Sequence, residues 1–101
     1  MGARAFFDTL ESKADAGKIA GVENSYLFIV EGEGSWLVDI RGGQVKVTEG
    51  WDGDADVTLR SSSEVFDRIV SGKQNPATAY MTGKIKLDGD LSAALKLQKI
   101  F

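Results

Sequence analysis

The sequence predicts an α+β fold in which a five-stranded, mostly antiparallel sheet carries helices on one face. Three short stretches between residues 25 and 49 have the patterns of strands and are separated by glycine-rich turns, which is typical of a meander. Helical patterns come before and after the meander, and two further strands lie among them. A run of strands followed mostly by helices favours an α+β domain over an alternating α/β one.

The first 24 residues are expected to form an amphipathic helix and a loop. Apolar residues recur there at the spacing of one helical face: Ala3, Phe6, Phe7, Leu10 and Ala14. We expect this helix to end near Gly17, with a loop over 18–24. Residues 25–31 (SYLFIVE) are apolar on both faces. A strand of this kind is covered on both sides, or it faces a cavity on one side.

The next two strands alternate apolar and polar residues. In 35–40, Trp36, Val38 and Ile40 share one face, and 44–49 places Val45 and Val47 inward. Gly42 and Gly43 between them fit a two-residue hairpin turn.

The second half of the chain is divided by residues that begin and end helices. A fourth strand is expected over 55–60, followed by a capping box with Ser61 as N-cap and Glu64 three residues later. That helix ends at Gly72. Asn75 and Pro76 then predict the start of a short helix, and 84–88 alternates as a fifth strand.

The last helix, predicted from the N-cap Asp90 to Phe101, is apolar over more than half of its circumference. Its apolar residues are Leu91, Ala93, Ala94, Leu95, Leu97, Ile100 and Phe101. A surface helix needs an apolar stripe of only roughly 100°. The helix therefore either packs between the sheet and another helix or a partner chain, or it roofs a cavity for an apolar ligand. Gln98 lies within the apolar arc, where a ligand head group, trapped water or fraying of the chain end would satisfy its amide.

Composition excludes several classes of function. The chain has no cysteine and no histidine, so it lacks thiolates, the commonest general base and the commonest metal ligand. Asp52, Asp54 and Asp56 do not continue into a calcium loop, because Val57 stands at the glycine position and Ser63 at the distal glutamate position. We therefore expect no enzymatic activity, no metal and no cofactor.

The bulk properties predict a single domain, 1–101, with 43% hydrophobic and 27% charged residues. No signal peptide and no apolar run of ~20 residues is evident, so a cytoplasmic location is expected. The net charge of −3 argues against nucleic-acid binding. The charge is unevenly distributed, because residues 73–101 contain five lysines against Asp88 and Asp90. This basic quarter is either a solvated face or a surface for transient contact with anionic membranes.

Residues 81–101 (MTGKIKLDGDLSAALKLQKIF) resemble the closing segment of the sterol carrier protein type 2 domain family. The shared features are a glycine, a lysine-flanked strand, a Gly-Asp turn and a helix with Lys-Leu-Gln. Segments 35–40, 55–59 and 71–76 are also similar to that family, so that the resemblance runs from Ser25 to the end. The part before Ser25 is shorter than in the family and matches poorly, and the chain ends at Phe101 without the tail that some relatives carry. Both departures are expected to change the width of the ligand tunnel that the family has.

The resemblance implies a hydrophobic tunnel between sheet and helices, closed by the C-terminal helix. The positions that correspond to its lining are Trp36, Phe66, Ile69, Tyr80, Met81, Leu91, Leu95 and Gln98. The implied function is binding and transfer of an apolar lipid: a fatty acid, a fatty acyl conjugate or a sterol-like molecule. The alternative is an accessory domain with a closed core, whose surplus apolar surface forms a homodimer or docks on an enzyme.

Overall fold

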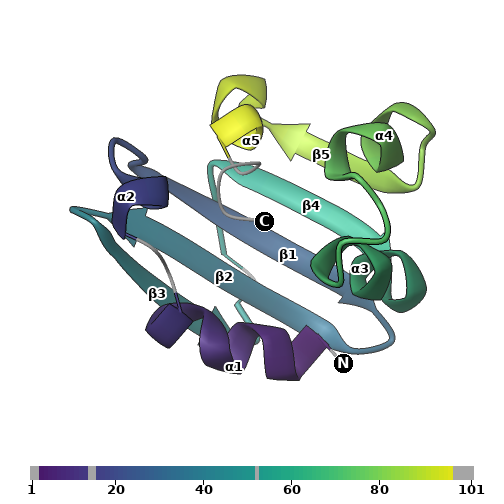
Figure 1. Ribbon diagram of the computed structural model, residues 1–101, viewed down its shortest axis with the longest axis horizontal. Helices are drawn as coiled ribbons and strands as arrows, with labels where there is room; N and C mark the ends of the chain where they lie inside the picture. Colours follow the sequence, from purple (N-terminus) through teal and green to yellow (C-terminus); the bar gives the residue numbers. More distant parts are fainter. Residues whose placement is uncertain (1–2, 14–15, 52, 97–101) are drawn as a thin grey trace.

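The computed structural model describes residues 3–13, 16–51 and 53–96, which form a five-stranded sheet with helices on one face (Figure 1). The strands are β1 Asn24–Glu31, β2 Gly34–Arg41, β3 Gln44–Glu49, β4 Val57–Ser62 and β5 Ile85–Gly89. The helices are α1 Ala3–Lys13, α2 Ala16–Ile19, α3 Ser63–Val70, α4 Pro76–Met81 and α5 Leu91–Lys96. The predicted α+β class is confirmed.

The sheet has the strand order β3-β2-β1-β4-β5. β1, β2 and β3 form the predicted antiparallel meander, and β5 runs antiparallel to β4. β4 lies parallel to β1, with Leu59 opposite Phe28. The sheet is therefore mostly antiparallel, as expected. The turn between β2 and β3 contains Gly42 and Gly43 at φ 57° and 75°, the pair of positive values that a two-residue hairpin turn requires.

The inner face of the sheet is covered by two groups of helices. Figure 1 shows α1 beside β2 and β3, while α3, α4 and α5 lie around β4 and β5. Under α1, the ring of Phe7 stacks on Trp36 at 4.8 Å between centroids and also meets Phe66 at 5.4 Å. Each such aromatic pair contributes about 0.5–1.5 kcal/mol beyond its buried area. This cluster closes the core on the α1 side.

The outer face is covered in part by the connection from β3 to β4. Ser35 Oγ donates a hydrogen bond to the Trp51 carbonyl oxygen at 3.1 Å, and Trp51 Nε1 donates to the Asp54 carbonyl oxygen at 3.2 Å. Trp51 lies beside Leu27 on this face, and Leu27 and Leu37 are both buried. The apolar side chains of β1 are therefore covered on both faces of the sheet, as its sequence predicts.

Two local predictions were wrong. The N-cap of α3 is Ser62, whose side chain accepts the Val65 N–H, and not Ser61. Ser61 still pairs with Ile85 in the β4–β5 ladder, so the backbone stays extended for one residue longer than expected. In addition, the loop expected from residue 18 overlaps the short helix α2.

The starts of α4 and α5 agree with the sequence. The Asn75 side chain accepts the N–H groups of Ala77 and Thr78, with Pro76 at the first helical position. The Asp90 side chain accepts the N–H of Ser92 at 2.9 Å. The predicted course of the last helix over 97–101 lies outside the described residues.

Candidate binding pocket

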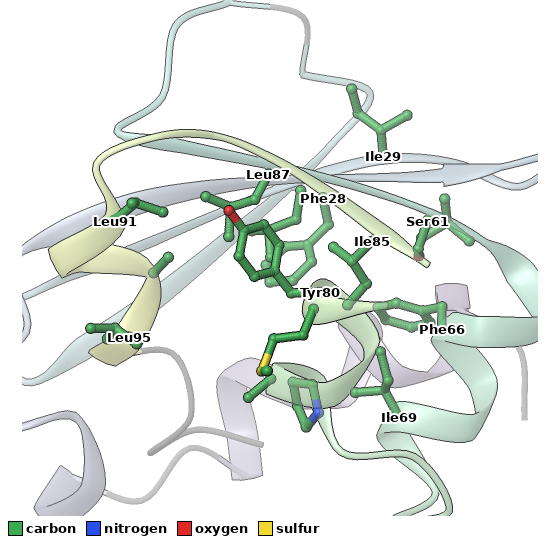
Figure 2. Close-up of a pocket in the computed structure, with 16 residues that line it drawn as sticks. Phe28, Ile29, Ser61, Phe66, Ile69, Tyr80, Ile85, Leu87, Leu91 and Leu95 are labelled. Atoms are coloured by element: carbon green, nitrogen blue, oxygen red, sulfur yellow. The ribbon is translucent and has the colours of Figure 1, made fainter. Parts of the chain in front are cut away.

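An apolar pocket of about 320 Å³ lies between the sheet and the helices α3, α4 and α5 (Figure 2). This volume is near the lower end of the ~300–1,000 Å³ that is typical of ligand sites. The residues that line it are Phe28, Ile29, Val30, Leu59, Ser61, Phe66, Ile69, Pro76, Ala77, Tyr80, Met81, Ile85, Leu87, Leu91, Ala94 and Leu95.

Two rows of inward-facing side chains form the floor. One row crosses three strands through Phe28, Leu59 and Leu87, which are direct neighbours in the sheet. The next row contains Ser61 and Ile85. Alternate residues of a strand point to the same face, so the pairing of β1, β4 and β5 alone brings these side chains together.

The walls come from the three helices. Phe66 and Ile69 on α3 are buried and close one end of the pocket. Figure 2 shows Leu91 and Leu95 projecting from α5 on one side and Tyr80 from α4 on the other, with Leu87 near them on β5. The N-caps Asn75 and Asp90 set where these two short helices begin.

The mouth of the pocket is an exposed apolar rim. We define the rim as four residues whose exposed fractions are high: Tyr80 at 45%, Met81 at 82%, Leu91 at 57% and Leu95 at 67%. Large apolar side chains that gather at one exposed place are typical of an interaction or ligand site. The sequence predicted surplus apolar surface on the last helix. Two residues of that surface, Leu91 and Leu95, lie at the edge of the pocket.

Polar groups are few in the pocket. Ser61 and Tyr80 contribute hydroxyls, and none of the described residues that line the wall is charged. Among the described residues, no group of three or more acidic side chains is placed to hold a metal ion. The chemistry available at this site is therefore burial of apolar surface and hydrogen bonding by hydroxyls.

α5 is joined to the central strand by a buried hydrogen bond. Tyr26 on β1 donates its hydroxyl to the Ala93 carbonyl oxygen at 2.6 Å, and both residues are buried. Burial raises the pKa of Tyr26 to about 12, and the nearby carboxylates of Asp56 and Asp90 act in the same direction. The phenol therefore stays protonated, and able to donate, far above neutral pH.

Six of the eight predicted site residues line the pocket: Phe66, Ile69, Tyr80, Met81, Leu91 and Leu95. Trp36 does not, because β2 lies on the α1 side of β1 and its indole is packed against Phe7. Gln98 lies outside the described residues. That any of these residues contacts lipid stays a proposal.

The sequence reasoning missed part of the floor. Leu59, Ile85 and Leu87 alternate with other residues along the two predicted strands, and this alternation was the available signal for a lining role. Ser61 was assigned to a helix cap, although its side chain faces the pocket. Tyr26 had no signal, because its partner lies 67 residues away along the chain.

The fold and the pocket together define a small α+β domain built to enclose an apolar ligand. The chain belongs to the SCP-2 sterol transfer family, whose model matches residues 4–101. The family and the solved sterol carrier structures that share the fold support binding and transfer of lipid as the function of this domain. Domains of this family are generally non-catalytic.

Curated relatives include longer proteins. The chain is 35% identical over 97 residues to hydroxysteroid dehydrogenase-like protein 2 of Xenopus tropicalis, which covers 93% of this chain and 23% of that protein. It is 35% identical over 68 residues to sterol carrier protein 2 of Homo sapiens, which covers 67% of this chain and 12% of that protein. The chain thus spans less than a quarter of the length of these relatives.

Solved structures share the fold over nearly the whole chain. The sterol carrier protein domain 2 of Helicoverpa armigera is 31% identical with a TM-score of 0.77, covering 95% of this chain and 82% of that one. A stereoselective inverting sec-alkylsulfatase from a Pseudomonas species is 26% identical with a TM-score of 0.81, covering 95% of this chain and 16% of that one. In the part of this chain that the structure describes, no helix is long and apolar enough to span a membrane.

Proposed function

We propose that this domain binds one apolar chain of a lipid in the pocket and delivers it to a membrane or an enzyme. The ligands in view are a fatty acid, a fatty acyl conjugate or a sterol-like molecule. The observation that carries the proposal is that the exposed apolar rim and the apolar pocket are one continuous surface. Burial of each methylene stabilises the complex by about 0.8 kcal/mol, from which the costs of association are subtracted.

The lining determines the orientation of the ligand. In the part of the chain that the structure describes, no charged side chain lines the pocket, and an unpaired carboxylate or phosphate is costly to remove from water. The lipid therefore enters with its apolar end first and keeps its head group at the rim, where the Tyr80 hydroxyl can donate a hydrogen bond to it.

The donor and acceptor of the lipid are proposed to be anionic membranes, contacted through the rim. α4 has no charged residue, and the only charge on α5 is Lys96. Lys84 and Lys86 lie at the edge strand β5, between these two helices in sequence. Lys86 alternates with the pocket-lining Ile85 and Leu87 and therefore lies on the other face of β5, and Asp88 and Asp90 follow in the same segment. The proposed attraction to an anionic lipid surface therefore depends mainly on the exposed Lys84 and Lys96, and salt screens it over about 8–10 Å.

Binding is tested by titrating the delipidated protein with a fluorescent long-chain fatty acid. Leu91→Asp places a charge on the rim, so its affinity is expected to fall at least tenfold. Ser92→Asp is the matched control, because Ser92 is an exposed neighbour on α5 that does not line the pocket. Absence of saturable binding to the unaltered protein would refute lipid binding, and equal affinities of the two variants would place the site elsewhere.

Membrane delivery is tested by following transfer of the bound fluorescent lipid to vesicles. Transfer to vesicles with anionic phospholipids is expected to be faster than to neutral vesicles, and the difference should shrink as salt is raised. Equal transfer rates to anionic and neutral vesicles at low salt would refute membrane steering, and the lysines would then be interpreted as a solvated face.

The competing function is an accessory domain whose rim is covered by a second copy of the chain or by an enzyme. The exposed rim is compatible with it, and a stoichiometric dimer that takes up no lipid would favour it. We further propose that the domain has no catalytic activity of its own, since the chain contains no histidine or cysteine. The cytoplasmic location stays a prediction from the sequence.

A further inference from the structure

The described part of the helix that roofs the pocket, Leu91–Lys96, buries little apolar surface. Of the described residues of α5, only Ala93 is buried, whereas Leu91 and Leu95 are exposed by more than half. Burial of one methyl group stabilises much less than burial of a leucine side chain. In the described part of α5, hydrogen bonds therefore hold the helix together with the burial of Ala93 and the packing of Ala94 against the core.

One set of contacts fixes the N-terminal end of α5. The Asp90 N–H donates to the Asp56 carbonyl oxygen at 3.0 Å. Gly89 has a φ of 115° and lies so close to this carbonyl that a Cβ would approach its oxygen to 2.2 Å. Asp56 is itself tied to β1, because its carboxylate accepts the Ser25 N–H at 3.0 Å. This end of α5 cannot move without disturbing the sheet.

A second contact fixes the middle of the helix. The Tyr26 hydroxyl bonds to the Ala93 carbonyl oxygen, and Tyr26 is fully buried on the central strand. Tyr26 does not line the pocket. Its hydrogen bond links it to α5, whose residues Leu91 and Leu95 do line the pocket.

We infer that Tyr26 sets the rate at which a lipid enters and leaves the pocket, because its hydrogen bond to Ala93 must break before α5 can swing outward about Gly89 and Asp90. The inference rests on the proposed function. It makes Tyr26 a positioning residue that holds the roof closed. A phenol in this position remains a donor at neutral pH, because burial raises its pKa to about 12.

The inference has a kinetic signature. Tyr26→Phe keeps the ring and removes the donor. From the net contribution of a typical hydrogen bond, the open population is expected to rise about 2- to 12-fold. Entry and release both pass through the open state, so the association and dissociation rates should rise by the same factor. The dissociation constant should then be unchanged.

The test uses the full chain, delipidated, with NBD-labelled stearate in stopped-flow measurements. Ile40→Val is the control, because Ile40 is fully buried on β2 away from the pocket and loses one methylene. Tyr26→Phe is expected to accelerate both rates, and Ile40→Val to leave both as in the unaltered protein. If Tyr26→Phe leaves both rates unchanged, or weakens affinity with an unchanged association rate, the inference is wrong.

Hydrogen exchange on the ligand-free protein separates this inference from the proposed function. Asp90 lies at the hinge, and its N–H donates to the Asp56 carbonyl oxygen at 3.0 Å, a bond that must break when the chain turns about Gly89 and Asp90. Exchange of the Asp90 N–H should accelerate about 2- to 12-fold in Tyr26→Phe and remain unchanged in Ile40→Val. Unaltered exchange in Tyr26→Phe would overturn the inference even if lipid binds. Faster exchange in a protein that binds no stearate would refute the proposed function and leave the role of Tyr26 in closing α5 supported.

Discussion

Substitution of Leu95 by tryptophan distinguishes a helix that roofs a cavity from one that packs on a closed core. Leu95 is 67% exposed at the rim. A substitution at such a place usually changes the free energy of unfolding by no more than about 0.5 kcal/mol. For a domain of this size that is at most about 4 °C in melting temperature.

The same change in the closed core provides the comparison. Leu10 on α1 is 8% exposed and packs in the main core. Overpacking there costs about 1–3 kcal/mol, so Leu10→Trp is expected to lower the melting temperature by roughly 4–24 °C. The contrast between the two variants follows from the exposure of Leu95 at the rim and the burial of Leu10 in the core.

The effect of Leu95→Trp on binding should be large where its effect on stability is small. If the indole displaces two or three methylenes of the lipid from the mouth, affinity falls by roughly 15- to 60-fold at ~0.8 kcal/mol per methylene. Differential scanning calorimetry and fatty-acid titration on the delipidated variants give the two quantities. If Leu95→Trp melts as early as Leu10→Trp while its affinity is unchanged, there is no cavity beneath α5.

Two further predictions concern α3 and Tyr26. Ser62→Ala should lower the free energy of unfolding, measured by urea denaturation, by about 0.5–2 kcal/mol because it removes the N-cap of α3. A larger loss in Ser61→Ala would indicate that Ser61 is the N-cap. Burial raises the pKa of Tyr26 from 10 to about 12, so the unfolded chain loses the phenol proton first. The stability that the neutral phenol contributes is fully present below pH 10 and is lost between pH 10 and 12, by up to about 1.4 kcal/mol per pH unit. Tyr26→Phe should lack this part of the pH dependence, and an identical slope in both proteins would contradict the assignment.

Local signals in the sequence were sufficient for most of the fold. The Gly42 and Gly43 turn, the alternation of β2 and β3, and the caps Asn75 and Asp90 each act within a few residues, and the structure has them where they were expected. Ser61 and Ser62 show the limit of such signals. Either serine can cap a helix, and the choice is made by β5, which extends the ladder as far as Ser61.

The part of the candidate site that lies on a single helix could be predicted from the sequence. The part that is set by the order of strands in the sheet could not. The wide apolar face of the last helix indicated surplus surface, and Leu91 and Leu95 supply it at the rim. The family resemblance placed Trp36 in the lining, and no local pattern in the sequence shows that β4 pairs with β1 on the side away from β2. That order puts Trp36 under α1 and the pocket over β4 and β5.

Native mass spectrometry tests the central claim most directly. The delipidated protein would be incubated with an excess of a long-chain fatty acid and, separately, of a fatty acyl conjugate, and then transferred under conditions that preserve complexes. The proposed function predicts a monomer carrying one lipid, with the adduct reduced in Leu95→Trp. A dimer that carries no lipid under both conditions would contradict it and favour the accessory domain.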